Sequence, residues 1–276
     1  MNSVQSNTLL TEIIDGITFS FLNEISFHCM YNDIFKGNQY KFSARTASPF
    51  ILDCGANIGM SVLYFKKLYP RARIIAFEPH PETFKLLQLN VQQNNLCDVQ
   101  LVNAAVADSD GEMEFYANED AVHWSLSDTG IPNRYAGPRG WKTITVPKVR
   151  LSSYITEPVD YLKLDIEGME EIVLREIVER IDSITEIRME FHSHIANKEN
   201  DLEHVLALLA RHQFKFAFEA NRKILSLHQA LRLIKSSEKH LFIVYLHRQG
   251  GRLWWQTRVV PQILRVQNRL MRKNRA

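Results

Sequence analysis

Short apolar runs alternate with segments of helical periodicity from Phe50 onward, and this alternation restricts the fold more than any other feature. Strands and helices in regular alternation form a parallel β-sheet that is covered by helices on both faces. The expected strands lie at 50–54, 73–77, 99–102, 161–164, 186–189, 214–218 and 241–246, and the expected helices near 60–68, 82–94, 169–180 and 201–212. We therefore predict one α/β domain over residues 50–247.

Residues 1–49 precede this domain and are expected to form a β-rich lead-in that packs on it. β-forming residues cluster at 17–22 and again at 25–31, and Gly37-Asn38 is a turn signal. We expect two strands here.

An insertion is expected between the third and fourth strands of the domain. Segments 111–116 and 143–149 have the pattern of a β pair. The polar loop between them, 117–142, is long for a compact domain, and such loops are usually functional or disordered. We interpret it as a lid.

Composition limits the class of protein. Hydrophobic residues make up 45% of the 276 residues, which suits one large globular domain. The chain has no basic leader followed by an apolar run, and no stretch approaches the roughly 18 apolar residues of a membrane span. The three cysteines form no C-x-x-C pair, and the body lacks the basic, aromatic-interleaved stripe typical of nucleic-acid binding. We expect a cytoplasmic protein that does not bind nucleic acid.

A loop of small residues, Asp53-Cys54-Gly55-Ala56-Asn57-Ile58-Gly59, connects the first strand of the domain to its first helix. Glycines let the backbone turn sharply and let a ligand approach closely, and the helix start offers N–H groups. The spacing is G-x-x-x-G and not the G-x-G-x-x-G of dinucleotide-binding proteins. A carboxylate at Asp53 would repel a pyrophosphate but suits a cofactor that carries an amino group.

Two further strand ends extend the predicted cofactor site. About 20 residues after the loop, the second strand ends at Glu78, where a carboxylate can accept hydrogen bonds from both hydroxyls of a ribose. Small residues follow the third strand, where an adenine would lie against the sheet edge. The alternative interpretations are a tight turn, a helix cap and ordinary packing. The predicted cofactor-binding residues are Asp53, Gly55, Ala56, Asn57, Gly59, Glu78, Asn103 and Ala104.

This loop, followed by an acid at the end of the second strand, resembles the class I S-adenosylmethionine-dependent methyltransferases. The run Tyr161–Glu170, YLKLDIEGME, is similar to the "lKxDxEGxE" of the FkbM family of methyltransferases. The upstream run Val149–Ile155 is similar to the usual lead of that family, although Ser152 stands where an Asp is common. The resemblance covers roughly residues 50–195.

The resemblance implies a Rossmann-like class I methyltransferase fold, with a seven-stranded, mostly parallel sheet whose last strand is antiparallel. It also implies S-adenosylmethionine as the cofactor and O-methylation as the reaction. The acceptor would be a hydroxyl of a sugar, a glycan or a natural product.

Residues at the ends of the fourth and fifth strands are the catalytic candidates, because ligands of such sheets bind at the carboxyl ends of the strands. These residues are Asp165, Glu167, Glu190 and His192. Methyl transfer to an alcohol needs an in-line acceptor and a group that takes its proton, and the histidine and the carboxylates stay alternatives for that base. The alternative interpretation of Asp165 is a helix cap. For Glu190 and His192 it is hydrogen bonding that ties the fifth strand to its neighbours.

A divalent metal is a further hypothesis. Asp165, Glu190 and His192 resemble the layout of catechol-type O-methyltransferases, in which an acid that ends the fourth strand helps to hold magnesium. Mg²⁺ or Mn²⁺ bound there could lower the pKa of the acceptor hydroxyl.

The proposed lid contains side chains suited to an acceptor pocket. His123, Trp124 and Ser125 are the predicted substrate residues, with Trp141 at the end of the loop, since aromatic faces stack on sugar rings. Aromatic residues that merely anchor a loop are the alternative.

The tail, residues 248–276, carries seven Arg and one Lys and no acidic residue. Its apolar side chains from 258 to 273 fall on one arc of a helix, and Trp254 and Trp255 precede it. A basic amphipathic helix of this kind is typical of a peripheral contact with the inner face of a membrane, and equally of a helix that packs on the domain or in a homo-oligomer.

Three other functions are alternatives that the sequence leaves open. A nicotinamide-dependent oxidoreductase is disfavoured by the glycine spacing and by Asp53. A non-catalytic S-adenosylmethionine-binding module is disfavoured by the carboxylates at every expected cofactor position. An N-methyltransferase would typically carry N-P-P-Y after the fourth strand, and this chain has no such motif.

Overall fold

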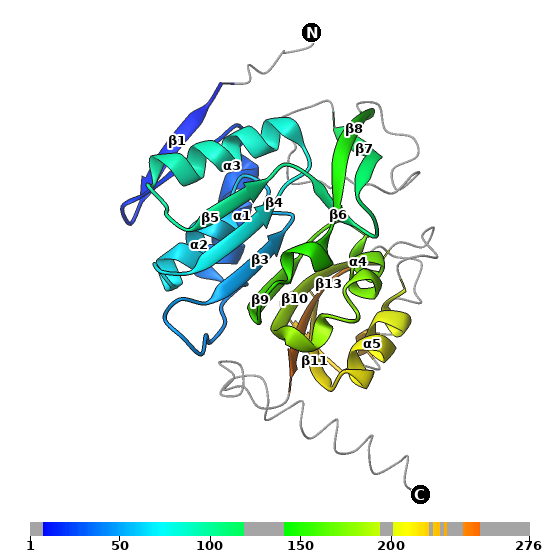
Figure 1. Cartoon of the computed structure of the whole chain (residues 1–276). Coiled ribbons are helices and arrows are strands. Elements are labelled where there is room, and N and C mark those ends of the chain that lie inside the picture. Colours follow the sequence, from blue (N-terminus) through cyan, green and yellow to red (C-terminus); the bar gives the residue numbers. More distant parts are fainter. Residues whose placement is uncertain are drawn as a thin grey trace, which may run out of the picture.

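The computed structural model describes residues 8–118, 141–193, 201–220, 223–226, 229–230 and 240–248. Within these residues eight strands form the central sheet, in the order β12-β11-β13-β10-β9-β3-β4-β5 (Figure 1). Their bounds are β3 Phe50–Cys54, β4 Arg73–Phe77, β5 Val99–Val102, β9 Val159–Leu164, β10 Ile184–Ser193, β11 Phe214–Ala220, β12 Lys223–Leu225 and β13 His240–Arg248.

The direction of the strands confirms the predicted sheet. Strands β5, β4, β3, β9 and β10 pair in parallel, and β13 runs antiparallel to both β10 and β11. The short β12 adds an antiparallel hairpin strand at the edge, beyond the seven that were expected. The chain moves outward from β3 to β4 and β5 and then returns to β9 on the other side of β3, so ligands are expected where β3 and β9 end side by side.

Helices cover both faces of the sheet. They are α2 Met60–Leu68, α3 Pro81–Gln93, α4 Glu170–Glu176 and α5 Leu202–Arg211, close to the predicted bounds, with one-turn helices η3 Leu151–Tyr154 and η4 Ile181–Ser183. Two helix starts have clear local causes. His80 caps α3, with Pro81 in its first turn, and the Asp201 side chain caps α5 by accepting from the Glu203 amide.

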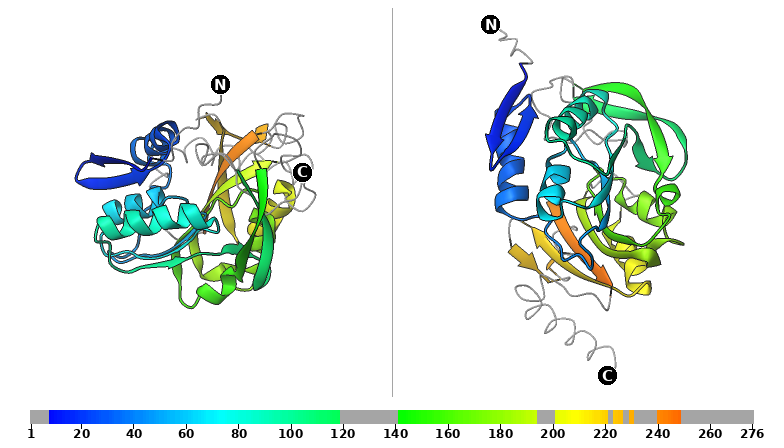
Figure 2. Two further views of the ribbon diagram at one scale, coloured as in Figure 1. Left: turned by 90° about the horizontal axis from the view of Figure 1, so that it is seen from above. Right: turned by 60° about the vertical axis from the view of Figure 1, so that its left-hand side comes forward.

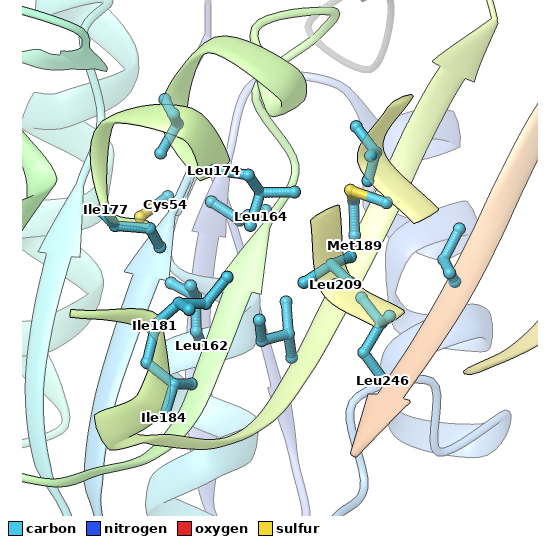
Figure 3. Close-up of a cluster of buried hydrophobic side chains, with 14 of the residues drawn as sticks. Cys54, Leu162, Leu164, Leu174, Ile177, Ile181, Ile184, Met189, Leu209 and Leu246 are labelled. Atoms are coloured by element: carbon cyan, nitrogen blue, oxygen red, sulfur yellow. The ribbon is translucent and has the colours of Figure 1, made fainter. Parts of the chain in front are cut away.

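Alternate residues of the strands enter two separate cores. On one face, Leu162, Leu164 and Met189 pack against Leu174 of α4, Ile177 at the end of α4 and Leu209 of α5, and their side chains point toward one another in Figure 3. On the other face, the cluster gathers side chains of α2, α3 and the N-terminal segment against β3 and β4. Near-continuous apolar runs in the central strands follow from this double burial.

The N-terminal segment differs from the prediction in part. Strands β1 Leu10–Ile14 and β2 Ile17–Phe21 form a hairpin, so the strand expected at 17–22 is found, but the strand expected at 25–31 is wrong. That stretch is helix α1, Glu24–Tyr31, followed by the π-helical turn η1, Asn32–Lys36. The Asn23 side chain accepts from the Ser26 amide at 2.7 Å, and this cap outweighs the β propensity of the residues that follow.

Polar side chains of α3 fix the hairpin in place. Asn90 accepts from the Ser20 amide at 2.7 Å and donates to the Ser20 carbonyl at 2.9 Å. Figure 2 shows the hairpin and α1 (blue) on the outside of the helices that cover β3 and β4.

The inserted β pair is present as part of a separate small sheet. Strands β7 Gly111–Asn118 and β8 Trp141–Arg150 are antiparallel, and β6 Ala105–Ala107 pairs with β8 in parallel. Residues 119–140 of the proposed lid and 249–276 of the basic tail lie outside the described residues, whereas the lid ends 117–118 and 141–142 belong to β7 and β8. Within the described ranges, the chain has no helix of the length and apolar character needed to cross a membrane.

Candidate active site

The β3–α2 loop, residues 53–59, turns back on itself at the carboxyl end of β3. Gly55, Asn57 and Gly59 all have positive φ, at 81°, 50° and 90°. The amides of Gly55 and Ala56 both donate to the Phe77 carbonyl, at 3.0 and 2.9 Å. A Cβ at position 55 would lie 1.9 Å from the Asp165 carbonyl oxygen, so the loop is in backbone contact with the end of β9 and position 55 requires glycine.

Glu78 joins this loop to the end of β4. One carboxylate oxygen accepts from the Asn57 amide at 2.9 Å and the other from the His80 amide at 2.9 Å. The Asn103 side chain donates to the Glu78 and Pro79 carbonyls at 2.8 and 3.1 Å, next to the buried Ala104. The predicted cofactor-binding residues of three neighbouring strand ends are thus brought together.

Asp53 has a different position from its predicted neighbours. Its side chain is fully buried beneath the loop, where Oδ2 accepts from the Ser61 hydroxyl at 2.5 Å. Its Oδ1 lies 3.3 Å from the Lys163 ammonium. Asp53 therefore stabilises the loop from within.

Lys163 is a functional candidate that the sequence interpretation missed. Its ammonium is buried on β9, donates to the Gly55 carbonyl at 2.7 Å and lies 3.5 Å from Asp165 Oδ2. Burial by itself would lower the pKa of Lys163, but the carboxylates of Asp53, Asp165 and Glu190 outweigh it and raise that pKa. The available signal was a lysine in the apolar run YLKL, because a charge in a buried strand needs partners.

Glu190 is held by the N-terminal segment, which the sequence interpretation also missed. Its Oε1 accepts from the Tyr40 hydroxyl at 2.5 Å and from the Gln39 side-chain amide. Burial and the nearby Glu190 carboxylate raise the pKa of Tyr40 well above its usual range, so the phenol stays protonated and donates. No periodic pattern marks residues 38–44, so their contact with β10 could not be inferred from the sequence.

The remaining predicted catalytic residues occupy the same edge. Asp165 follows β9 with its side chain 25% exposed, and Glu167 has a positive φ of 56° in the turn before α4. His192 lies on β10, in register with Leu241, and the structure does not describe its side chain. His123, Trp124 and Ser125 lie outside the described residues.

Two of the predicted metal ligands, Asp165 and Glu190, have other partners, and the side chain of the third, His192, is not described. Among the described residues, no three side chains of the His, Cys, Asp and Glu types are arranged to hold a metal ion. The Asp165 carboxylate pairs with the Lys163 ammonium, and the Glu190 carboxylate accepts hydrogen bonds from the neutral side chains of Gln39 and Tyr40.

The fold is similar to that of a solved methyltransferase FkbM from Methylobacillus flagellatus. The similarity has a TM-score of 0.51 at 13% identity and covers 79% of this chain and 48% of the other. At this identity, the match supports the fold alone.

Sequence relatives cover much of the same region. They include methyltransferase sdnD of Sordaria araneosa, 29% identical over 60% of this chain and 74% of the relative. The 2-O-methyltransferase NoeI of Sinorhizobium fredii is 28% identical over 46% of this chain and 56% of its own length. The 31-O-demethyl-FK506 methyltransferase FkbM of Streptomyces tacrolimicus is 28% identical over 74% of this chain and 88% of the relative.

The family model of the methyltransferase FkbM domain matches residues 53–216, which include the β3–α2 loop, Glu78, Lys163, Asp165 and Glu190. The match covers more than half of the chain and begins at the first acid of the predicted cofactor loop. The chain therefore belongs to the methyltransferase FkbM domain family and is an S-adenosylmethionine-dependent methyltransferase.

Proposed function

We propose that the protein transfers a methyl group to a hydroxyl oxygen of a sugar, a glycan or a natural product. The observation that carries this proposal is the polar set at the ends of β9 and β10, where Asp165 and Glu190 lie beside the hydrogen-bonding side chains of Gln39 and Tyr40. Such a set suits a polar, hydroxylated acceptor. The printed names of two relatives, a 2-O-methyltransferase and a 31-O-demethyl-FK506 methyltransferase, describe O-methylation.

The residues at the ends of β3, β4 and β5 fit the proposed cofactor. When bound, S-adenosylmethionine supplies a methyl group on a positively charged sulfur. Glu78 would accept hydrogen bonds from the ribose hydroxyls, and Asn103 and Ala104 would border the adenine. Gly55, Ala56, Asn57 and Gly59 would present backbone groups to the cofactor, with Asp53 fixing the loop from beneath.

On the acceptor side, the proton of the reacting hydroxyl needs a base at the same sheet edge. Asp165, Glu167, Glu190 and His192 are the candidates, as proposed from the sequence. The reaction needs no metal in this scheme, because a carboxylate can take the proton directly. Metal assistance through Asp165, Glu190 and His192 is the alternative. The metal ion would then have to compete for Asp165 with the Lys163 ammonium, which lies 3.5 Å from that carboxylate.

Calorimetric titration of S-adenosylhomocysteine, with NAD as the comparison ligand, tests the cofactor. We expect S-adenosylhomocysteine to bind and NAD not to bind. We expect Glu78→Gln to weaken that binding by about tenfold or more, because the amide removes the charge and places an NH₂ against a backbone N–H. Glu82→Gln is the control, since Glu82 is exposed on α3 and pairs with Lys85.

Binding of NAD instead would favour the oxidoreductase and overturn the proposal. S-adenosylhomocysteine binding without turnover of any acceptor would favour the non-catalytic module.

A panel of hydroxylated sugars, glycans and natural products, with amines as the comparison class, tests the acceptor. Mass spectrometry should find O-methyl products and no N-methyl products. Activity that survives EDTA would support transfer without a metal, whereas activity restored only by Mg²⁺ or Mn²⁺ would support the metal alternative. Participation of the lid residues, membrane contact of the tail, a homo-oligomer and a cytoplasmic location stay predictions.

A further inference from the structure

We propose that Lys163 is a positioning residue that locks the β3–α2 loop against the end of β9 and so shapes the cofactor site. This inference rests on the proposed cofactor, which the loop would hold.

The bonds of the Lys163 ammonium join two parts of the site. On the loop side it donates to the Gly55 carbonyl at 2.7 Å and pairs with Asp53 at 3.3 Å. On the strand side it pairs with Asp165 at 3.5 Å. One cation therefore bridges the first acid of the loop and the acid that ends β9.

Backbone contacts also hold the β3–α2 loop against the end of β9. The Asp165 amide donates to the Cys54 carbonyl at 3.1 Å, and the space beside Gly55 is closed by the Asp165 carbonyl. A small displacement of the loop therefore changes the place of Asn57, whose amide donates to Glu78.

The site of Lys163 is shielded from water. The lysine side chain is 3% exposed, that of Asp53 is 0% exposed, and the Tyr40 ring centroid lies 5.3 Å from the ammonium. Buried ion pairs in a low dielectric are strong only while both partners are present, because removal of one leaves an uncompensated charge. Loss of Lys163 would therefore expel Asp53 or draw water beneath the loop.

Calorimetry with S-adenosylhomocysteine and thermal melting on full-length variants test the proposal. Lys163→Met should weaken S-adenosylhomocysteine binding by about tenfold or more and lower the Tm. Lys66→Met is the matched control, because Lys66 is also buried and also donates to a backbone carbonyl, that of Ala72, away from the loop. It should lower the Tm and leave the affinity within about twofold.

A double variant, Asp53→Asn with Lys163→Met, covers the case in which the single variant does not fold. Removal of both charges should restore much of the Tm, but S-adenosylhomocysteine should still bind about tenfold more weakly than to the unmodified protein, since Gly55 and Asp165 lack their cation. Full affinity in the double variant would overturn the proposal, because Lys163 would then only neutralise Asp53. An equal loss of affinity in Lys66→Met would overturn it as well.

Failure of the proposed cofactor gives a different result, because the unmodified protein itself would then not bind S-adenosylhomocysteine and the inference would be wrong. Failure of the proposed acceptor alone would leave this binding, and the comparison of the variants, unchanged.

Discussion

Strands β9 and β10 present apolar side chains on one face and charged side chains on the other. Leu162, Leu164 and Met189 pack beneath α4 and α5, whereas Lys163 and Arg188, which are paired in register, are buried on the opposite face. The apolar contacts are non-directional and tolerate small shifts. The charged side chains require specific partners at specific distances, because an unpaired charge in the interior is costly.

The charged face is covered by residues 38–44 of the N-terminal segment. Arg188 donates to the Gln39 and Lys41 carbonyls, and its guanidinium lies 3.7 Å from the Tyr245 ring centroid. On the other side, the hydroxyl of Tyr69, which follows α2, donates to the Phe42 carbonyl at 2.9 Å. A strand in which apolar and charged residues alternate usually has only one buried face. Here the charged face is buried as well, and its polar contacts position Glu190 and the β3–α2 loop.

The comparison predicts that substitutions on the apolar face change stability without changing the site. Leu162→Ala should lower the free energy of unfolding by about 3 kcal/mol, because Leu162 is fully buried and the cavity cannot close completely. Denaturant unfolding measures this, and Leu9→Ala, at an exposed leucine, should cost less than about 0.5 kcal/mol. A changed affinity of the folded Leu162→Ala protein for S-adenosylhomocysteine would contradict the separation of the two faces.

The charged face should make stability depend on pH through Glu186. Burial raises the pKa of Glu186 from 4.5 to about 7, and the nearby Arg188 only partly opposes this shift. The unfolded chain therefore releases this proton near pH 4.5 and the folded protein near pH 7. Folding binds a proton between these values, so the contribution of Glu186 to stability is present below pH 4.5 and is lost as the pH rises to 7.

Thermal melting of the unmodified protein and of Glu186→Gln between these pH values measures the effect. The difference in unfolding free energy between the two proteins should change by at most about 3 kcal/mol, in favour of the variant as the pH rises. Parallel pH profiles for the two proteins would show that Glu186 does not titrate in this window.

The smallest expected effect concerns the contact between the covering segment and Glu190. Tyr40→Phe removes one hydrogen bond to the carboxylate and should lower kcat by about tenfold, or about 1.4 kcal/mol, with the acceptor found in the panel. The affinity for S-adenosylhomocysteine should stay within about twofold. Tyr69→Phe is the control, because it loosens the same segment without touching Glu190. An equal loss of kcat in both variants would reduce Tyr40 to a structural role.

Local patterns in the sequence were sufficient to predict most of the sheet and to predict that the residues of the proposed cofactor site lie close together. Strands β3, β4 and β5 and helix α2 have the predicted bounds, because each is an apolar run or a helical period between turn residues. It could be inferred from their positions after the strands that the loop glycines, Glu78 and Asn103 lie close together, since the carboxyl ends of parallel strands meet at one edge of the sheet. Helix α1 was missed although its signal, the Asn23 cap, is also local.

Only the tertiary structure decided the partners of the buried charges. The lysine of β9 predicts that partners exist, but the sequence does not say that they are Asp53 and Asp165, or that Tyr40 bonds to a carboxylate 150 residues away. Periodicity determines which face a side chain joins. The segment that covers that face depends on how the whole chain packs, and for that reason the contacts of Gln39 and Tyr40 with Glu190 became visible only in the folded protein.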